Sequence, residues 1–246
     1  MKKFLLIAFI GAFTSVQAQT VLNEVYTEPN AGKEEFFELY NSGAAGQSVD
    51  CFTLVIYWKT ATNTRGWYVL DLPNLNVASK GFFVGASANP FDVQSQTGVA
   101  ANFNWNDANF RNGSTGGSLK KYQLNGTNTG YTDVTASIPA NLNDLFSDVS
   151  VGGGHNYITL VYVNGAFNNG FWGGGSSATL PAEITGMAAL PVDMAGACSD
   201  FNASFGSLVV ESVNQSPGVD NGFARLFDGK CGAWDKTSAQ VNHTPG

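Results

Sequence analysis

Residues 34–58 constrain the fold more than any other part of the chain. They contain two apolar runs, at 36–40 and 52–57, separated by a connector rich in Gly, Ala and Ser. Apolar and polar side chains alternate within these runs, and turn-forming residues stand at their ends. Alternation with a period of two is typical of half-buried strands in an antiparallel sheet. The stretch therefore predicts either a β-hairpin or a corner at which the chain passes between two sheets.

Other segments of the chain continue the strand pattern. The dipeptide Asn164-Gly165 between two apolar runs is a strong signal for a two-residue hairpin turn. The chain has 29 glycines and 13% aromatic residues, but only 13% charged residues, which suits strands joined by glycine turns. Further strands are expected at 21–26, 66–72, 80–86, 118–124, 155–164, 166–172, 207–213 and 223–227. We predict an all-β fold of two packed sheets, with scarcely any helix and with Phe37, Leu39, Leu54 and Ile56 buried between the sheets.

Residues 1–18 have the three parts of a signal peptide. Two lysines stand at the start, an apolar run occupies 4–13, and Val16-Gln17-Ala18 resembles a cleavage site. The apolar run is too short to span a bilayer, which takes about 20 residues. No later apolar run is long enough, so no transmembrane segment is expected. The sequence predicts a mature chain that begins at Gln19 and is secreted or held at the cell surface.

The mature chain, 19–246, is expected to form one domain. No linker divides it, and its length suits one large β-domain better than two small ones. Two irregular regions interrupt the strand pattern, near 87–117 and near 173–206. Both are interpreted as long loop insertions into a sandwich, and long ordered loops often carry function.

Charge argues against one class of partner. The chain has 12 Lys and Arg against 19 Asp and Glu, a net charge of −7. Nucleic-acid binding depends largely on basic side chains that neutralise phosphates, and no basic patch is evident. The expected partners are therefore proteins or glycans at the cell surface, and not nucleic acid.

The first insertion contains the candidate ligand-binding residues Phe103, Trp105 and Phe110. They lie among Asn, Asp and Gly, which suggests a surface loop. An exposed aromatic ring beside amide side chains can stack on a sugar ring or anchor a protein contact. The alternative is that these rings pack the loop onto the sandwich.

Calcium is the cofactor that the loops could hold, and no other cofactor is expected. Calcium accepts oxygen ligands from Asp, Asn and backbone carbonyls in loops. The candidates are Asp107 and Asn109 in the first insertion, and Asp220 and Asn221 before the final strands. None of them matches EF-hand spacing, and the alternative is that they are solvated turn residues.

Three cysteines allow at most one disulfide within the chain. Export makes a disulfide plausible. Cys198 and Cys231 both lie in loop-like sequence, so their pairing is favoured. Cys51 lies at the edge of the predicted strand 52–57 and is interpreted either as a partner or as a small buried apolar residue.

Enzymatic motifs are scarce. The chain has two histidines, His155 and His243, and neither stands near a recognisable nucleophile. No G-x-S-x-G motif occurs, and Gly152-Gly153-Gly154 is interpreted as a turn. Two facing carboxylates would suffice for a glycoside hydrolase, but the carboxylates are scattered along the chain.

Both ends of the mature chain resemble the lamin-tail domain family. The resemblance is carried by Asn23-Glu24-Val25-Tyr26, by residues 36–41 (FFELYN), by Val49-Asp50 with Phe52-Thr53-Leu54, and by a closing pattern at 221–226, Trp234 and Thr244-Pro245-Gly246. It implies an immunoglobulin-like β-sandwich that serves in binding or anchoring. The expected function is therefore an exported, non-catalytic interaction or adhesion module. A carbohydrate-binding module that uses exposed aromatics is the alternative, and a glycoside hydrolase is the third reading.

Overall fold

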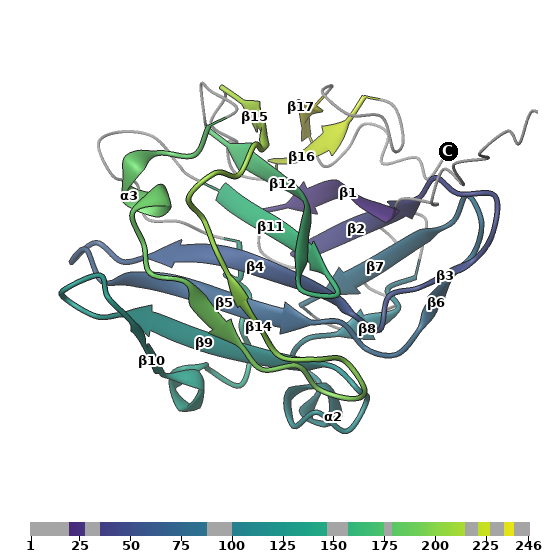
Figure 1. Ribbon diagram of the computed structural model, residues 1–246. Coiled ribbons are helices and arrows are strands. Elements are labelled where there is room, and N and C mark those ends of the chain that lie inside the picture. The colour runs from purple at the N-terminus through teal and green to yellow at the C-terminus, as the bar shows by residue number, and fades with distance from the viewer. Residues whose placement is uncertain are drawn as a thin grey trace, which may run out of the picture.

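The computed structural model describes residues 20–27, 35–87, 100–146, 157–174, 179–214, 221–226 and 234–238. Nearly all regular structure in these residues is β, and the strands form two large sheets that pack face to face (Figure 1). The expected all-β sandwich is confirmed. The predicted signal peptide lies outside the described residues.

The first sheet has six strands. All neighbouring strands are antiparallel except β7 and β8, which are parallel. Strand β8 is a short strand at one end of the sheet. It belongs to the first insertion, so the first insertion supplies an edge of this sheet. The order is β17 (Trp234–Ser238), β16 (Asn221–Arg225), β1 (Thr20–Tyr26), β2 (Phe36–Asn41), β7 (Phe82–Ala86) and β8 (Phe103–Asn104).

The second sheet has seven strands. Its last pair, β12 and β15, is parallel and the other pairs are antiparallel. Asn164 and Gly165 join β11 to β12 with φ values of 49° and 76°, as the predicted hairpin turn requires. The order is β10 (Tyr131–Asp133), β9 (Ser118–Leu124), β5 (Arg65–Asp71), β4 (Phe52–Lys59), β11 (Tyr157–Val163), β12 (Ala166–Gly173) and β15 (Glu211–Val213).

Residues 35–58 form a corner between the two sheets. Its first strand, β2, belongs to the six-stranded sheet and its second, β4, to the seven-stranded sheet. The buried side chain of Asn41 stabilises the corner: its Nδ2 donates to the carbonyls of Ala45 and Ala78, at 2.9 and 3.0 Å, and its Oδ1 accepts from Gly43 N. The small two-stranded sheet of β3 (Gln47–Ser48) and β6 (Asn76–Val77) lies on the same connection.

The main core lies between the sheets. Phe37, Leu39, Leu54 and Ile56 are all buried in it, as predicted from the alternation. Trp234 closes the core near the C-terminal end, where its ring stacks on that of Phe171 at 4.1 Å.

A second apolar core covers the outer face of the seven-stranded sheet. The second insertion supplies it with α3 (Ala182–Thr185), β13 (Leu190–Val192) and β14 (Phe201–Ala203), and Figure 1 shows β14 crossing β4 and β5. Trp67 stacks on Phe205 with ring centroids 4.4 Å apart, and Tyr57 and Lys59 contact Glu183 of α3 at 2.7 and 2.6 Å. The seven-stranded sheet is therefore covered on both faces, and residues 179–206 of the second insertion form a third layer.

Candidate functional site

The aromatic residues of the first insertion are buried, so the prediction that they lie in an exposed loop is wrong. Trp105 is 0% exposed, Phe110 is 1% exposed and Phe103 is 9% exposed. Trp105 stacks against Phe37 of β2, with ring planes 12° apart, and its Nε1 donates to the carbonyl of Leu142 at 3.0 Å. These rings belong to the main core, which confirms the alternative reading that they pack the loop onto the sandwich.

The polar residues around these rings explain why they are buried. Asn102 Oδ1 accepts from Val84 N at 2.8 Å, and Asn104 Oδ1 accepts from Asn106 N at 2.7 Å. Asn106 donates to the carbonyl of Ser87, and Arg111 donates to that of Trp105. The polar side chains thus satisfy backbone groups of the insertion and of the neighbouring strand β7, which lets the chain turn sharply while its aromatic rings pack inward.

A glycine makes room for Phe103. On the neighbouring strand β7, a Cβ added to Gly85 would lie 2.6 Å from the Phe103 ring and 2.4 Å from the Phe37 ring. Only glycine allows the Phe103 ring to lie this close to the sheet. The short strand β8 therefore holds its aromatic residue against the sandwich rather than in solvent.

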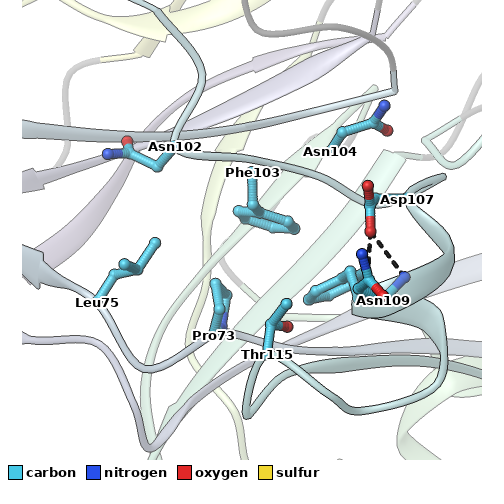
Figure 2. Close-up of a pocket in the computed structure, with 9 residues that line it drawn as sticks. Pro73, Leu75, Asn102, Phe103, Asn104, Asp107, Asn109 and Thr115 are labelled. Atoms are coloured by element: carbon cyan, nitrogen blue, oxygen red, sulfur yellow. Dashed lines mark hydrogen bonds between the residues drawn. The ribbon is translucent and has the colours of Figure 1, made fainter.

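A groove of about 630 Å³ opens where the first insertion meets the β5–β6 connection (Figure 2). Its apolar floor consists of Phe103, Phe110, Pro73 and Leu75, and Figure 2 shows the Phe103 ring in the middle of the surrounding side chains. Leu75 is 37% exposed, which is high for a large apolar side chain in this protein. Polar side chains form the rest of the lining: Asn102, Asn104, Asp107, Asn109 and Thr115.

The hydrogen bonds within the protein fix which polar atoms the groove presents. The carbonyl oxygens of Asn102 and Asn104 are bonded to backbone N–H groups, so their Nδ2 groups remain as donors. Asp107 Oδ1 accepts from Asn109 N and Phe110 N at 2.7 and 3.3 Å, so Oδ2 remains as an acceptor. No side-chain hydrogen bond joins Asn109 or Thr115 to another residue in the described ranges. The groove therefore presents both donors and acceptors beside an apolar floor.

Of the four calcium candidates, Asp107 and Asn109 have another role, and the side chains of the other two are not covered by the described residues. Asp107 is the N-cap of α2 (Ala108–Arg111), and Asn109 contributes a backbone N–H to that cap. Asp220 and the side chain of Asn221 are outside the described residues. Among the residues that the structure describes, three potential ligands meet only at Asp50, Cys51 and Cys198, and the two cysteines there are bonded to each other. Calcium binding stays a prediction.

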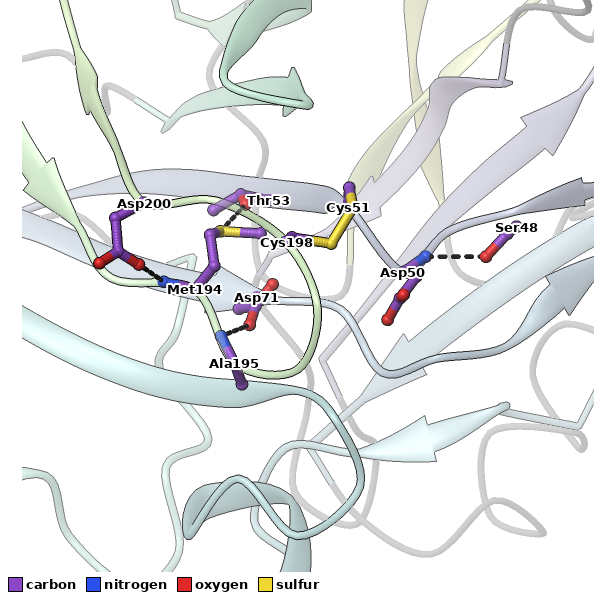
Figure 3. Close-up of a disulfide and its surroundings, with 9 residues drawn as sticks. All are labelled: Ser48, Asp50, Cys51, Thr53, Asp71, Met194, Ala195, Cys198 and Asp200. Atoms are coloured by element: carbon purple, nitrogen blue, oxygen red, sulfur yellow. Dashed lines mark hydrogen bonds between the residues drawn. A yellow bond between two sulfur atoms is a disulfide. The ribbon is translucent and has the colours of Figure 1, made fainter.

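The disulfide joins Cys51 to Cys198, and not Cys198 to Cys231 as predicted (Figure 3). The second insertion folds back over the seven-stranded sheet, so its loop at 193–200 lies beside the start of β4. The predicted pairing assumed that the second insertion lies beside the closing strands. Its actual position over the seven-stranded sheet cannot be predicted from the sequence. Cys231 lies outside the described residues.

Beneath this loop lies a carboxyl group that the sequence analysis did not single out. Asp71, the last residue of β5, is 0% exposed, and its Oδ2 accepts from Ala195 N at 2.6 Å (Figure 3). Its Oδ1 is buried without a hydrogen-bond partner. Burial raises the pKa of Asp71 to about 7; the bond from Ala195 opposes this rise, nearby Asp50 adds to it and Lys120 opposes it. Its place between two buried leucines, Leu70 and Leu72, was the only available signal.

We expect Asp71 to make stability depend on pH. Its pKa is about 7 in the folded protein and about 3.9 in an unfolded chain. The folded protein therefore binds more protons between these values, and this group lowers the free energy of unfolding by up to about 1.4 kcal/mol for each pH unit of rise. The contribution is constant below pH 4 and above pH 7.

Asp71→Asn tests this expectation, because Asn still accepts from Ala195 N but does not titrate. Urea denaturation of both proteins should be compared from pH 4 to pH 8. The stability of the variant relative to the wild type should rise through this range and level off above pH 7. Parallel stability curves for the two proteins would show that Asp71 is not held in its neutral form.

Comparison of the chain with protein-family models, with curated proteins and with solved structures finds no match. Within the described ranges, no helix combines the length and the apolar character needed to cross a membrane.

Proposed function

We propose that this protein is an exported, non-catalytic interaction module of the lamin-tail type, with an immunoglobulin-like sandwich, which acts in adhesion at the cell surface. The observation that carries the proposal is the groove between the first insertion and the β5–β6 connection. It combines an apolar floor with several unengaged polar atoms, the usual composition of a ligand-binding surface.

The chemistry of the groove favours recognition over catalysis. Among the described residues that line it, Asp107 is the single carboxylate, and one of its oxygens already caps α2. Glycoside hydrolysis in most families uses two carboxyl groups on opposite sides of the bond that is cleaved. A groove with one carboxylate supports binding better than hydrolysis.

The rigidity of the groove supports the same proposal. Phe103 lies on β8, Phe110 lies on α2, and their rings contact each other with centroids 4.7 Å apart. Asn102 and Asn104 are held by bonds to Val84 N and Asn106 N. A surface that is ordered before the ligand arrives loses less conformational entropy when it binds.

Two features support export. The N-terminus has the three parts of a signal peptide. The Cys51–Cys198 disulfide is of a kind that persists mainly in oxidising compartments.

The proposal is tested in cells that produce the protein. We expect the accumulated protein to begin at Gln19 and to be found outside the cytoplasm.

Cells that lack it should attach less well to their natural surface, and the wild-type gene should restore attachment. A Thr115→Trp variant, which fills the groove from an exposed position, should be exported normally but should not restore it. A cytoplasmic protein that keeps Met1, or full restoration by this variant, would contradict the proposal.

A further inference from the structure

We infer that the groove binds a neutral oligosaccharide, an inference that rests on the proposed function and names the ligand of its contact surface. It follows from three properties of the lining residues: their charge, the arrangement of their donors and acceptors, and the shape of their apolar floor.

Charge excludes strongly anionic ligands. No Lys, Arg or His occurs among the described residues that line the groove, and these residues include the carboxylate of Asp107. The whole chain carries a net charge of −7. A phosphate, sulfate or sialic acid group in this groove would find no cation to pair with and would be repelled by Asp107.

The polar atoms suit a ligand rich in hydroxyl groups. Asn102 and Asn104 present N–H donors, Asp107 presents an acceptor, and the amide of Asn109 and the hydroxyl of Thr115 present both. A sugar hydroxyl donates one hydrogen bond and accepts others, so it can bridge donors and acceptors that lie side by side. An apolar ligand would leave these groups unpaired, at a cost in affinity.

The floor suits the apolar face of a sugar ring. Phe103 lies in the centre of the groove, flanked by Pro73 and Leu75 (Figure 2). Phe103 as a residue is 9% exposed and offers only a limited patch, while Leu75 is 37% exposed. The C–H groups of one sugar unit can therefore pack against Leu75 and the edge of Phe103 together. The volume of about 630 Å³ is within the range of sites that bury small ligands. This differs from stacking on Trp105, which the structure places in the core.

The test is a binding measurement on the purified mature chain. The probes are linear oligosaccharides of four to six units built from glucose, mannose, galactose, xylose or N-acetylglucosamine. Sialylated, sulfated and uronic-acid oligosaccharides form the anionic set. We expect at least one neutral oligosaccharide to bind and the anionic set not to bind.

Two variants place the ligand in the groove. Asn109→Ala and Thr115→Val remove polar groups that make no hydrogen bond within the described residues, so the fold should be unaffected. The double variant should bind the neutral oligosaccharide about tenfold or more weakly, since each lost hydrogen bond weakens binding several-fold. Asn202→Ala is the matched control: Asn202 is exposed on β14, outside the groove, and this variant should bind like the wild type.

The outcomes separate this inference from the proposed function. If no neutral oligosaccharide binds, or if one binds equally well to the double variant, the inference is overturned. If the Thr115→Trp cells also regain attachment, the proposed function fails with it. If attachment still depends on the groove while no neutral oligosaccharide of the panel binds the purified chain, the function stands and the carbohydrate inference fails.

Discussion

Replacing Trp105 with alanine should lower the free energy of unfolding by about 3–5 kcal/mol. The Trp105 side chain is fully buried, stacks on Phe37 and meets Phe146 edge to face with centroids 6.0 Å apart. Its removal leaves a large cavity in the main core and also takes away the hydrogen bond to the carbonyl of Leu142. The measurement is urea denaturation of the wild type and the variant at one pH.

Trp105→Phe is the matched control for this prediction. Phenylalanine keeps an aromatic ring at the site but cannot donate to Leu142, so its loss should be clearly smaller than that of alanine. An unchanged stability for Trp105→Ala would show that the Trp105 side chain is exposed to solvent and not buried in the core. It would also contradict the position of β8 at the edge of the six-stranded sheet.

Removal of the disulfide should cost about 2–5 kcal/mol of stability. The bridge joins residues separated by 147 positions, and constraining so long a loop in the unfolded chain has a large effect in the chain-entropy account. Cys198→Ser also releases the loop at 193–200 from the start of β4. The free energy of unfolding of the oxidised proteins is the quantity to measure.

A double-mutant cycle tests the pairing itself. Cys51→Ser, Cys198→Ser and the double variant should lose about the same stability, because any of them removes the same bond. The matched variant is Cys231→Ser, which leaves the bridge intact. Additive losses for Cys51 and Cys198, or a loss for Cys231→Ser equal to that for Cys198→Ser, would contradict the Cys51–Cys198 bond.

Local patterns in the sequence were sufficient to predict the main strands. The alternation at 36–40 and 52–57 correctly assigned Phe37, Leu39, Leu54 and Ile56 to the core. Asn164-Gly165 correctly predicted the β11–β12 turn. These features depend on neighbours within a few residues, so periodicity and turn chemistry reveal them.

The two insertions could not be predicted in the same way. Strand β8 has only two residues and pairs in parallel with β7, the strand before it in the chain, so no alternating pattern marks it. The segment that carries α3, β13 and β14 covers a sheet face that the pattern of β4 alone does not identify as buried. The Asn and Asp residues around Trp105 resembled those of a solvated loop, but they bond to the backbone instead. Similarly, no local signal shows that Cys51 lies beside Cys198 or that Asp71 lies under the same loop.

The proposed interaction module rests on two separate observations, a resemblance in the sequence and a groove in the structure. The resemblance to lamin-tail domains implies a binding or anchoring module, and the groove offers a surface where such binding would take place. Neither depends on the other, since the motifs of the resemblance lie at the two ends of the mature chain and the groove is built from the first insertion and the β5–β6 connection.

The central claim is that the groove is the ligand-contacting surface, and side-chain amide resonances test it most directly. The ¹⁵N-labelled mature chain should be titrated with the neutral oligosaccharide that binds tightest in the panel. We expect the amide signals of Asn102, Asn104 and Asn109 to shift in proportion to ligand bound, while that of Asn41, which is buried and bonded to backbone carbonyls, stays in place. Shifts confined to residues outside the groove, with these three signals unchanged, would contradict the claim.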